Sequence, residues 1–127
     1  MANFVFDKSR STFEGHGQTW KVRSGIPGRY SPLPNGLYAV PKGSLMSGTP
    51  GLGVPHDPKY AQPPYRFTDK AGFSWFLWLG IGDLGVHPDG NVPGTMGCIG
   101  IADDDTKPLF YKLRQLNNET EITVLVK

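Results

Sequence analysis

The sequence is 127 residues long, and its 13 Lys and Arg against 11 Asp and Glu leave a net charge of +2. This length fits one domain, residues 1–127, because a chain of this size buries roughly two-thirds of its unfolded surface. The absence of a basic run argues against a nucleic-acid partner, and no apolar run approaches the roughly 18 residues that insert into a membrane.

The chain begins MANFVFDKSR, which lacks the apolar segment of a signal peptide, so we expect a protein made in the cytoplasm without a leader. Seventeen glycines and twelve prolines, without a period and interleaved with aromatic residues, are typical turn residues of a mostly β domain. In chain order, the expected strands are residues 3–6, 11–14, 19–24, 36–40, 65–68, 73–79, 84–87, 98–101 and 121–126.

Two segments are expected to be loops. Residues 25–35 are too rich in proline for regular structure, and residues 44–64 form a long loop of the kind that is usually functional or mobile. The sequence predicts one short helix near the C-terminus, residues 106–116, capped by Asp105 or Thr106.

Cys98 is the only cysteine, so it forms no disulfide within the chain. An ordinary thiol has a pKa near ~8.5 and needs a base to act as a nucleophile at neutral pH. His87 lies eleven residues upstream, across a connection rich in glycine and proline. If the strands that hold these residues are neighbours, the connection brings imidazole to sulfur. The alternative is that Cys98 is a small buried apolar residue.

The residues before the cysteine suit an electrophilic pocket. Gly97 leaves room for a substrate carbonyl, and the backbone N–H groups of Met96, Gly97 and Cys98 are candidate donors to an oxyanion. Thr95 is expected either to position His87 or to stabilise the turn.

Four further candidates have two interpretations each. Asp89 orients His87, or it is a turn former in the sequence HPDG. His16, between two glycines, and His56, in the long loop, line the cleft or are exposed loop residues. The acidic run 103–105 precedes the predicted helix and suits the positive end of its dipole better than a metal ion. No Cys/His spacing indicates zinc, and we expect neither a metal nor a cofactor.

The segment GVHPDGNVPGTMGCIGI, residues 85–101, resembles the active-site segment of the L,D-transpeptidase (YkuD-like) family, in which a histidine precedes a Ser/Thr-x-Gly-Cys block. TWKVRSG and PLPNGLYAV resemble the short, leaderless branch that includes type VI secretion effectors and phage-associated proteins. Met96 stands where many housekeeping members have a second histidine, and Gly100 stands where they often have Asn or Arg.

The resemblance implies a YkuD-like β-sandwich or barrel that transfers acyl groups on peptidoglycan stem peptides. Cys98 would form a thioester with expulsion of D-alanine, and His87 would move the proton. Water, a D-amino acid or a second stem would be the acceptor. An effector would be delivered to the periplasm or cell wall and would have an immunity protein as partner.

Two other functional classes share some of these features. NlpC-type and CHAP amidases also use Cys and His, but their cysteine precedes the histidine, whereas every histidine here precedes Cys98. A non-catalytic peptidoglycan-binding or structural module remains the alternative to an enzyme.

Overall fold

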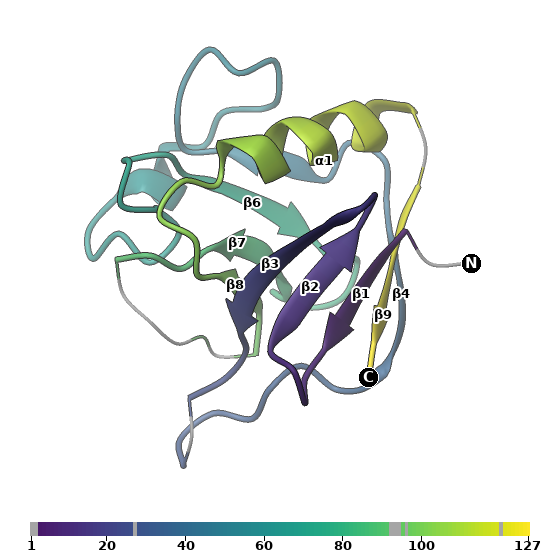
Figure 1. Ribbon diagram of the computed structural model, residues 1–127. Coiled ribbons are helices and arrows are strands. Elements are labelled where there is room, and N and C mark those ends of the chain that lie inside the picture. Colours follow the sequence, from purple (N-terminus) through teal and green to yellow (C-terminus); the bar gives the residue numbers. More distant parts are fainter. Residues whose placement is uncertain (1–2, 27, 92–94, 96, 120) are drawn as a thin grey trace.

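The computed structural model describes residues 3–26, 28–91, 95, 97–119 and 121–127. These residues form nine strands, one α-helix and one short 3-10 helix (Figure 1). The strands are β1 (Phe4–Asp7), β2 (Thr12–Gly15), β3 (Gln18–Arg23), β4 (Gly36–Val40), β5 (Leu45–Ser47), β6 (Trp75–Trp78), β7 (Gly85–Pro88), β8 (Ile99–Ile101) and β9 (Ile122–Val126). The helices are η1 (Pro58–Ala61) and α1 (Lys107–Glu119). The mostly β fold with one short helix near the C-terminus is therefore confirmed.

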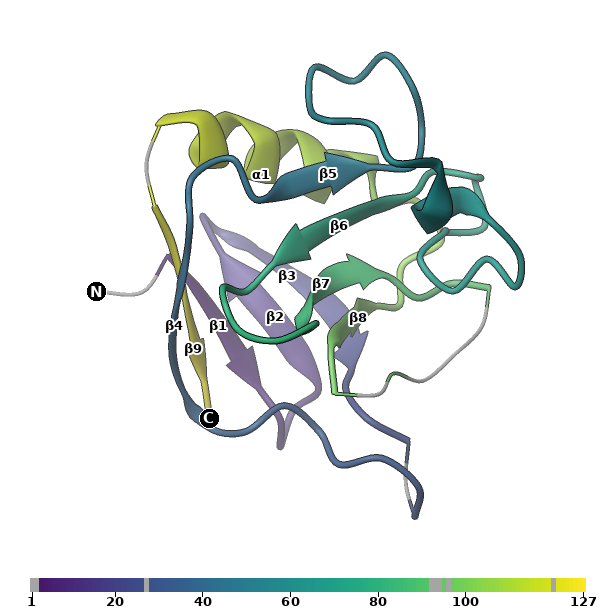
Figure 2. The same ribbon diagram turned by 180° about the vertical axis from the view of Figure 1, so that it is seen from behind.

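All nine strands belong to one sheet, in the order β4-β9-β1-β2-β3-β8-β7-β6-β5. The pairs β1–β9 and β7–β8 are parallel, and the remaining neighbours are antiparallel. Figures 1 and 2 show that the sheet curls into a half-barrel, with α1 across one end and alongside β5. Among the described helices, none has the length and apolar character needed to span a membrane.

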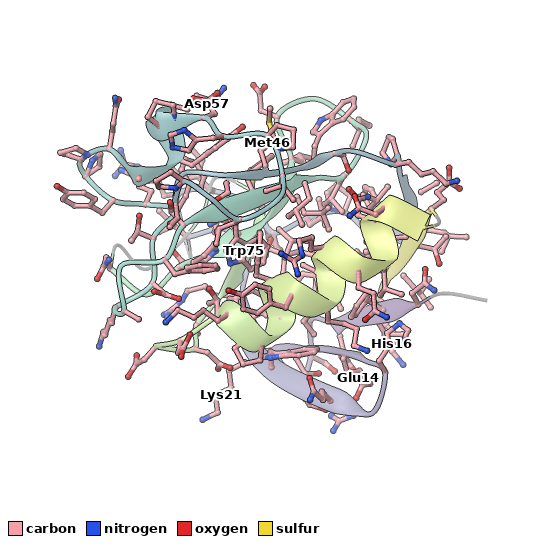
Figure 3. All side chains as sticks on the ribbon, turned by 90° about the horizontal axis from the view of Figure 1, so that it is seen from above. Glu14, His16, Lys21, Met46, Asp57 and Trp75 are labelled. Carbon is pink, nitrogen blue, oxygen red and sulfur yellow. The ribbon has the colours of Figure 1, made fainter. Side chains whose placement is uncertain are left out.

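The core lies between the curled sheet and the helix. Leu109, Phe110 and Leu113 form the buried face of α1, as the i, i+3, i+4 pattern of an amphipathic helix predicts. Trp75 of β6 is fully buried beneath the helix (Figure 3), and its indole N–H donates to Thr106 Oγ1 at 2.8 Å. Because side chains alternate along a strand, Phe76 points to the opposite face, which carries the candidate site.

Three sequence-based expectations were wrong. The expected loop 44–64 contains β5 and η1, and residues 65–68 are not a strand, although Thr68 makes a single bridge to Ser74. Helix α1 does not end at Asn117 but continues to Glu119. The side chain of Asn117 is buried, where it accepts from Leu45 N at 3.1 Å and donates to Pro41 O at 2.9 Å. An asparagine expected to end the helix therefore ties it to the sheet.

Candidate active site

His87 lies on β7, and Cys98 immediately precedes the neighbouring strand β8, on the same face of the sheet. Strands β7 and β8 pair in parallel, with Val86 opposite Ile99 and His87 opposite Gly100. Side chains two residues apart share a face, so Cys98, just before β8, points to the same side as Gly100 and His87. Strands β7 and β8 are therefore neighbours, and their register places the two side chains on one face of the sheet.

Both side chains line one cavity of about 300 Å³. His87 is only 3% exposed, whereas the thiol of Cys98 is partly accessible. The cavity is lined by Arg66, Phe67, Asp83, Leu84, His87, Thr95 and Cys98. In the part of the chain that the structure describes, no three His, Cys, Asp or Glu residues are grouped to hold a metal ion. The cavity therefore brings a thiol and an imidazole to one concave surface.

Aromatic rings surround His87. Phe67 meets the imidazole edge-on at a centroid distance of 4.6 Å, and Phe76 stacks on it at 6.1 Å. This burial lowers the pKa of His87 from 6.5 to about 4, although the Pro88 carbonyl opposes the shift. The Pro88 oxygen can only accept and lies 2.6 Å from Nδ1, so the proton is on Nδ1. His87 is therefore neutral at pH 7, with a lone pair on Nε2.

The thiol of Cys98 is protonated in the resting site. Burial raises its pKa, as do the negative charges of Asp83 and Asp89, while a hydrogen bond with the Gly85 backbone opposes them. The Sγ atom also donates to Asp83 O at 3.6 Å. A protonated thiol and a neutral imidazole that line the same cavity suit general-base catalysis, in which the proton moves as the sulfur attacks, rather than a preformed ion pair.

Thr95 organises the loop that carries the cysteine. Its Oγ1 accepts from Gly25 N at 2.8 Å and from Gly97 N at 3.2 Å, and it donates to Cys98 O at 2.7 Å. Of the two expected roles of Thr95, the structure shows the contacts of the turn-stabilising one. The Gly97 N–H, one of the three candidate oxyanion donors, donates to Thr95 Oγ1 in this state, and a second candidate, Met96, lies outside the described residues.

Asp89 is fully buried, and its carboxylate pairs with Arg23, with Oδ2 at 2.9 Å from Arg23 Nε. The Pro88 carbonyl oxygen lies 2.6 Å from His87 Nδ1, and the orientation of His87 by Asp89 stays a prediction. A Cβ at Gly100 would lie 2.7 Å from the Asp89 side chain. The absence of a side chain at Gly100 therefore leaves room for the Asp89 carboxylate, which pairs with Arg23.

The other two histidines do not line this cavity. His16 is exposed in the β2–β3 turn, where its ring lies 5.3 Å from that of Phe4. Figure 3 shows His16 beside Glu14, on the opposite side of the molecule from Asp57. His56 is exposed, and its Nε2 lies 3.3 Å from Gly48 O.

No protein-family model matches this chain, and no curated protein matches it either. Solved structures do match. A Mycobacterium tuberculosis L,D-transpeptidase 1 is 18% identical over 97% of this chain, with a TM-score of 0.57. An Enterococcus faecium L,D-transpeptidase mutant is 16% identical over 99%, with a TM-score of 0.58. The chain spans 57% and 49% of the lengths of these two proteins.

A catalytic domain from an E. faecium L,D-transpeptidase, acylated by ertapenem, matches over nearly its whole length: 100% of this chain and 98% of that one, at 19% identity and a TM-score of 0.52. The chain has the fold of an L,D-transpeptidase catalytic domain. At these sequence identities the likeness concerns the fold alone and not the chemistry of the site.

Several residues of this L,D-transpeptidase fold that line the cavity were missed from the sequence. Arg66 and Phe67 come from a segment interpreted as a strand, and Asp83 and Leu84 come from the turn after β6. The only signal was the Gly-Asp pair at 82–83, which indicates a turn but not one that faces the thiol.

Proposed function

We propose that this chain is a cysteine enzyme that transfers acyl groups on peptidoglycan stem peptides. The observation that carries the proposal is that His87 on β7 and Cys98, the residue before the adjacent strand β8, line one cavity. The lone pair on His87 Nε2 supplies the base that a protonated thiol needs. The fold is that of enzymes named for this reaction class.

In the proposed reaction, Cys98 Sγ attacks the carbonyl carbon at the L-centre of meso-diaminopimelate, and its proton passes to His87 Nε2. The C–N bond to the terminal D-alanine breaks, and the departing amine takes the proton. The product is a thioester on Cys98. Hydrolysis completes an L,D-carboxypeptidase cycle, and attack by an amine completes exchange or crosslinking. Backbone N–H groups of residues 96–98 are the proposed oxyanion donors.

The test uses purified tetrapeptide muropeptides, with and without D-methionine, followed by mass spectrometry. We expect release of D-alanine in both cases, and a D-methionine-containing product where the amino acid is present. Cys98→Ala should lose both activities. No release of D-alanine, or full activity in Cys98→Ala, would contradict the proposal and would favour a non-catalytic peptidoglycan-binding module.

Covalent acylation by a carbapenem gives a second, independent test of Cys98 as the nucleophile. Because an E. faecium catalytic domain of this fold is acylated by ertapenem, we expect one equivalent of ertapenem to add covalently to this chain at Cys98. Intact-protein mass spectrometry followed by peptide mapping locates the adduct. An adduct elsewhere, or equal labelling of Cys98→Ala, would refute Cys98 as the nucleophile.

We also propose that the enzyme acts as an antibacterial effector or a phage-associated cell-wall enzyme, from the resemblance of TWKVRSG and PLPNGLYAV to that branch of the family. Exported to the periplasm of a test bacterium, the chain should stop growth, while the same chain kept in the cytoplasm should not. Cys98→Ala should be harmless in both compartments. Equal toxicity of Cys98→Ala would contradict an enzymatic effector, and suppression by a co-expressed protein would identify its immunity partner.

A further inference from the structure

A second cavity, of about 340 Å³, adjoins the one at Cys98. It is lined by Lys59, Tyr60, Phe67, Phe76 and Asp83. Phe67 and Asp83 line both cavities, so the two lie next to each other, and Cys98 lines only the first. Two adjoining cavities can hold the acyl donor and the acyl acceptor separately.

The second cavity has an apolar floor. Tyr60 and Phe76 stack with centroids 5.2 Å apart and planes 2° from parallel. Phe67 meets them edge-on, at 5.5 Å from Tyr60 and 5.7 Å from Phe76. Such a floor favours an apolar side chain over water as the occupant.

Opposite charges border this floor. The Lys59 ammonium lies 5.1 Å from the centre of the Tyr60 ring and 3.5 Å from Asp57 Oδ2, while Asp57 Oδ1 accepts from Lys59 N at 3.1 Å. The ammonium is thus held at η1 and, with three donors, retains capacity for another carboxylate. Asp83 supplies the negative charge.

Asp83 places that negative charge next to the reacting sulfur. Its backbone oxygen accepts from Cys98 Sγ at 3.6 Å, and its charge is one of those that raise the pKa of the thiol. Because Asp83 lines both cavities and its carboxylate acts electrostatically on the thiol, we expect a cation bound by that carboxylate to lie near the carbon of a thioester on Cys98. An amine held there is in position to attack.

We propose that the second cavity binds the acyl acceptor through its α-amino-carboxylate head, with the ammonium on Asp83, the carboxylate on Lys59 and an apolar side chain on Tyr60 and Phe76. This inference rests on the proposed function. The head belongs to a free D-amino acid or to the diaminopimelate end of a second stem.

The ammonium of the bound acceptor loses one proton to solvent, and the neutral amine attacks the thioester carbon. The new C–N bond forms as the C–S bond breaks. A second proton leaves the nitrogen, passes to His87 Nε2 and is delivered to the departing sulfur, which restores the thiol and the neutral imidazole. Asp83 and Lys59 bind the acceptor and take no part in the bond changes.

The experiment measures how much of the Cys98 thioester reacts with an amine and how much reacts with water. Full-length wild type, Asp83→Asn and Lys59→Gln react with a tetrapeptide muropeptide and D-methionine, and mass spectrometry gives the ratio of exchanged to hydrolysed product. We expect each variant to lower this ratio about two- to fivefold, the size of a charge contact partly open to solvent. Lys70→Gln, which removes an equally exposed lysine paired with Asp104, should leave the ratio unchanged.

D-Methioninamide, which lacks the carboxylate, tests the assignment to Lys59. We expect the preference for D-methionine over D-methioninamide to fall in Lys59→Gln and to persist in Lys70→Gln. Comparing the same two amines across variants removes their different intrinsic reactivity. Without added amino acid, dimeric muropeptides would show that the head can come from a second stem, and their absence would assign it to free amino acids.

The outcomes separate the two proposals. D-Alanine release with an unchanged ratio in both Asp83→Asn and Lys59→Gln overturns the acceptor site and leaves the proposed function standing. Hydrolysis alone, with no product from any amine, does the same. If no thioester forms and no D-alanine is released, the proposed function fails and the acceptor site fails with it.

Discussion

Replacing His87 with Gln is expected to slow acylation of Cys98 by about 10²- to 10⁴-fold, the usual contribution of a positioned general base. The effect should be large because burial and nearby carboxylates raise the pKa of the thiol, so little thiolate forms without the imidazole. Stopped-time mass spectrometry of the ertapenem adduct gives the rate. Raising the pH should partly restore the variant, since hydroxide then replaces the missing base.

The matched control is His16→Gln, which removes an exposed imidazole that lines neither cavity. It should react at the wild-type rate. A wild-type rate in His87→Gln would show that His87 is not the base. A loss that high pH does not repair would instead indicate a structural role for the imidazole.

Acidification should destabilise the protein through the same histidine. Burial lowers the pKa of folded His87 from 6.5 to about 4, so between these values the unfolded chain takes up a proton that the folded chain excludes. Stability is therefore complete above pH 6.5 and falls as the pH falls towards 4. A change from 6.5 to about 4 corresponds to about 3 kcal/mol of unfolding free energy.

Urea unfolding of wild type and His87→Gln at pH 7 and pH 4 measures this contribution. Other groups also titrate in this range, so the informative quantity is the difference between the two proteins. Wild type should lose about 3 kcal/mol more than His87→Gln, whereas His16→Gln should follow wild type. Parallel losses in wild type and His87→Gln would show that the folded imidazole is solvated.

The strands at His87 and next to Cys98 could be predicted from the sequence. Residues 84–87 and 98–101 are apolar, short and separated by turn residues, and they correspond to β7 and β8 within a residue or two. Their parallel pairing was not predictable, because it depends on where the intervening chain returns. That pairing decides that His87 and Cys98 share a face.

The sequence-based predictions were wrong for segments whose structure depends on tertiary contacts rather than on the local sequence pattern. Strand β5 has three residues among glycines and prolines, and its alignment with β6 depends on a partner about thirty positions away. Phe67 looked like a strand residue but packs against His87 from a loop. Most residues that line the proposed acceptor site come from short or irregular segments of this kind. The nature of the acyl acceptor could therefore not be predicted from the sequence.

The contact between Gly100 and Asp89 couples the identities of two positions that lie eleven residues apart. A side chain at residue 100 would collide with the Asp89 carboxylate, and loss of that carboxylate would leave Arg23 without its buried partner. Single substitutions toward the Asn or Arg of housekeeping enzymes should therefore be poorly tolerated, whereas a joint change at 89 and 100 removes the collision. We therefore expect positions 89 and 100 to change together in evolution. A side chain gained at residue 100 before Asp89 is replaced would collide with the carboxylate, so that order of mutations is blocked.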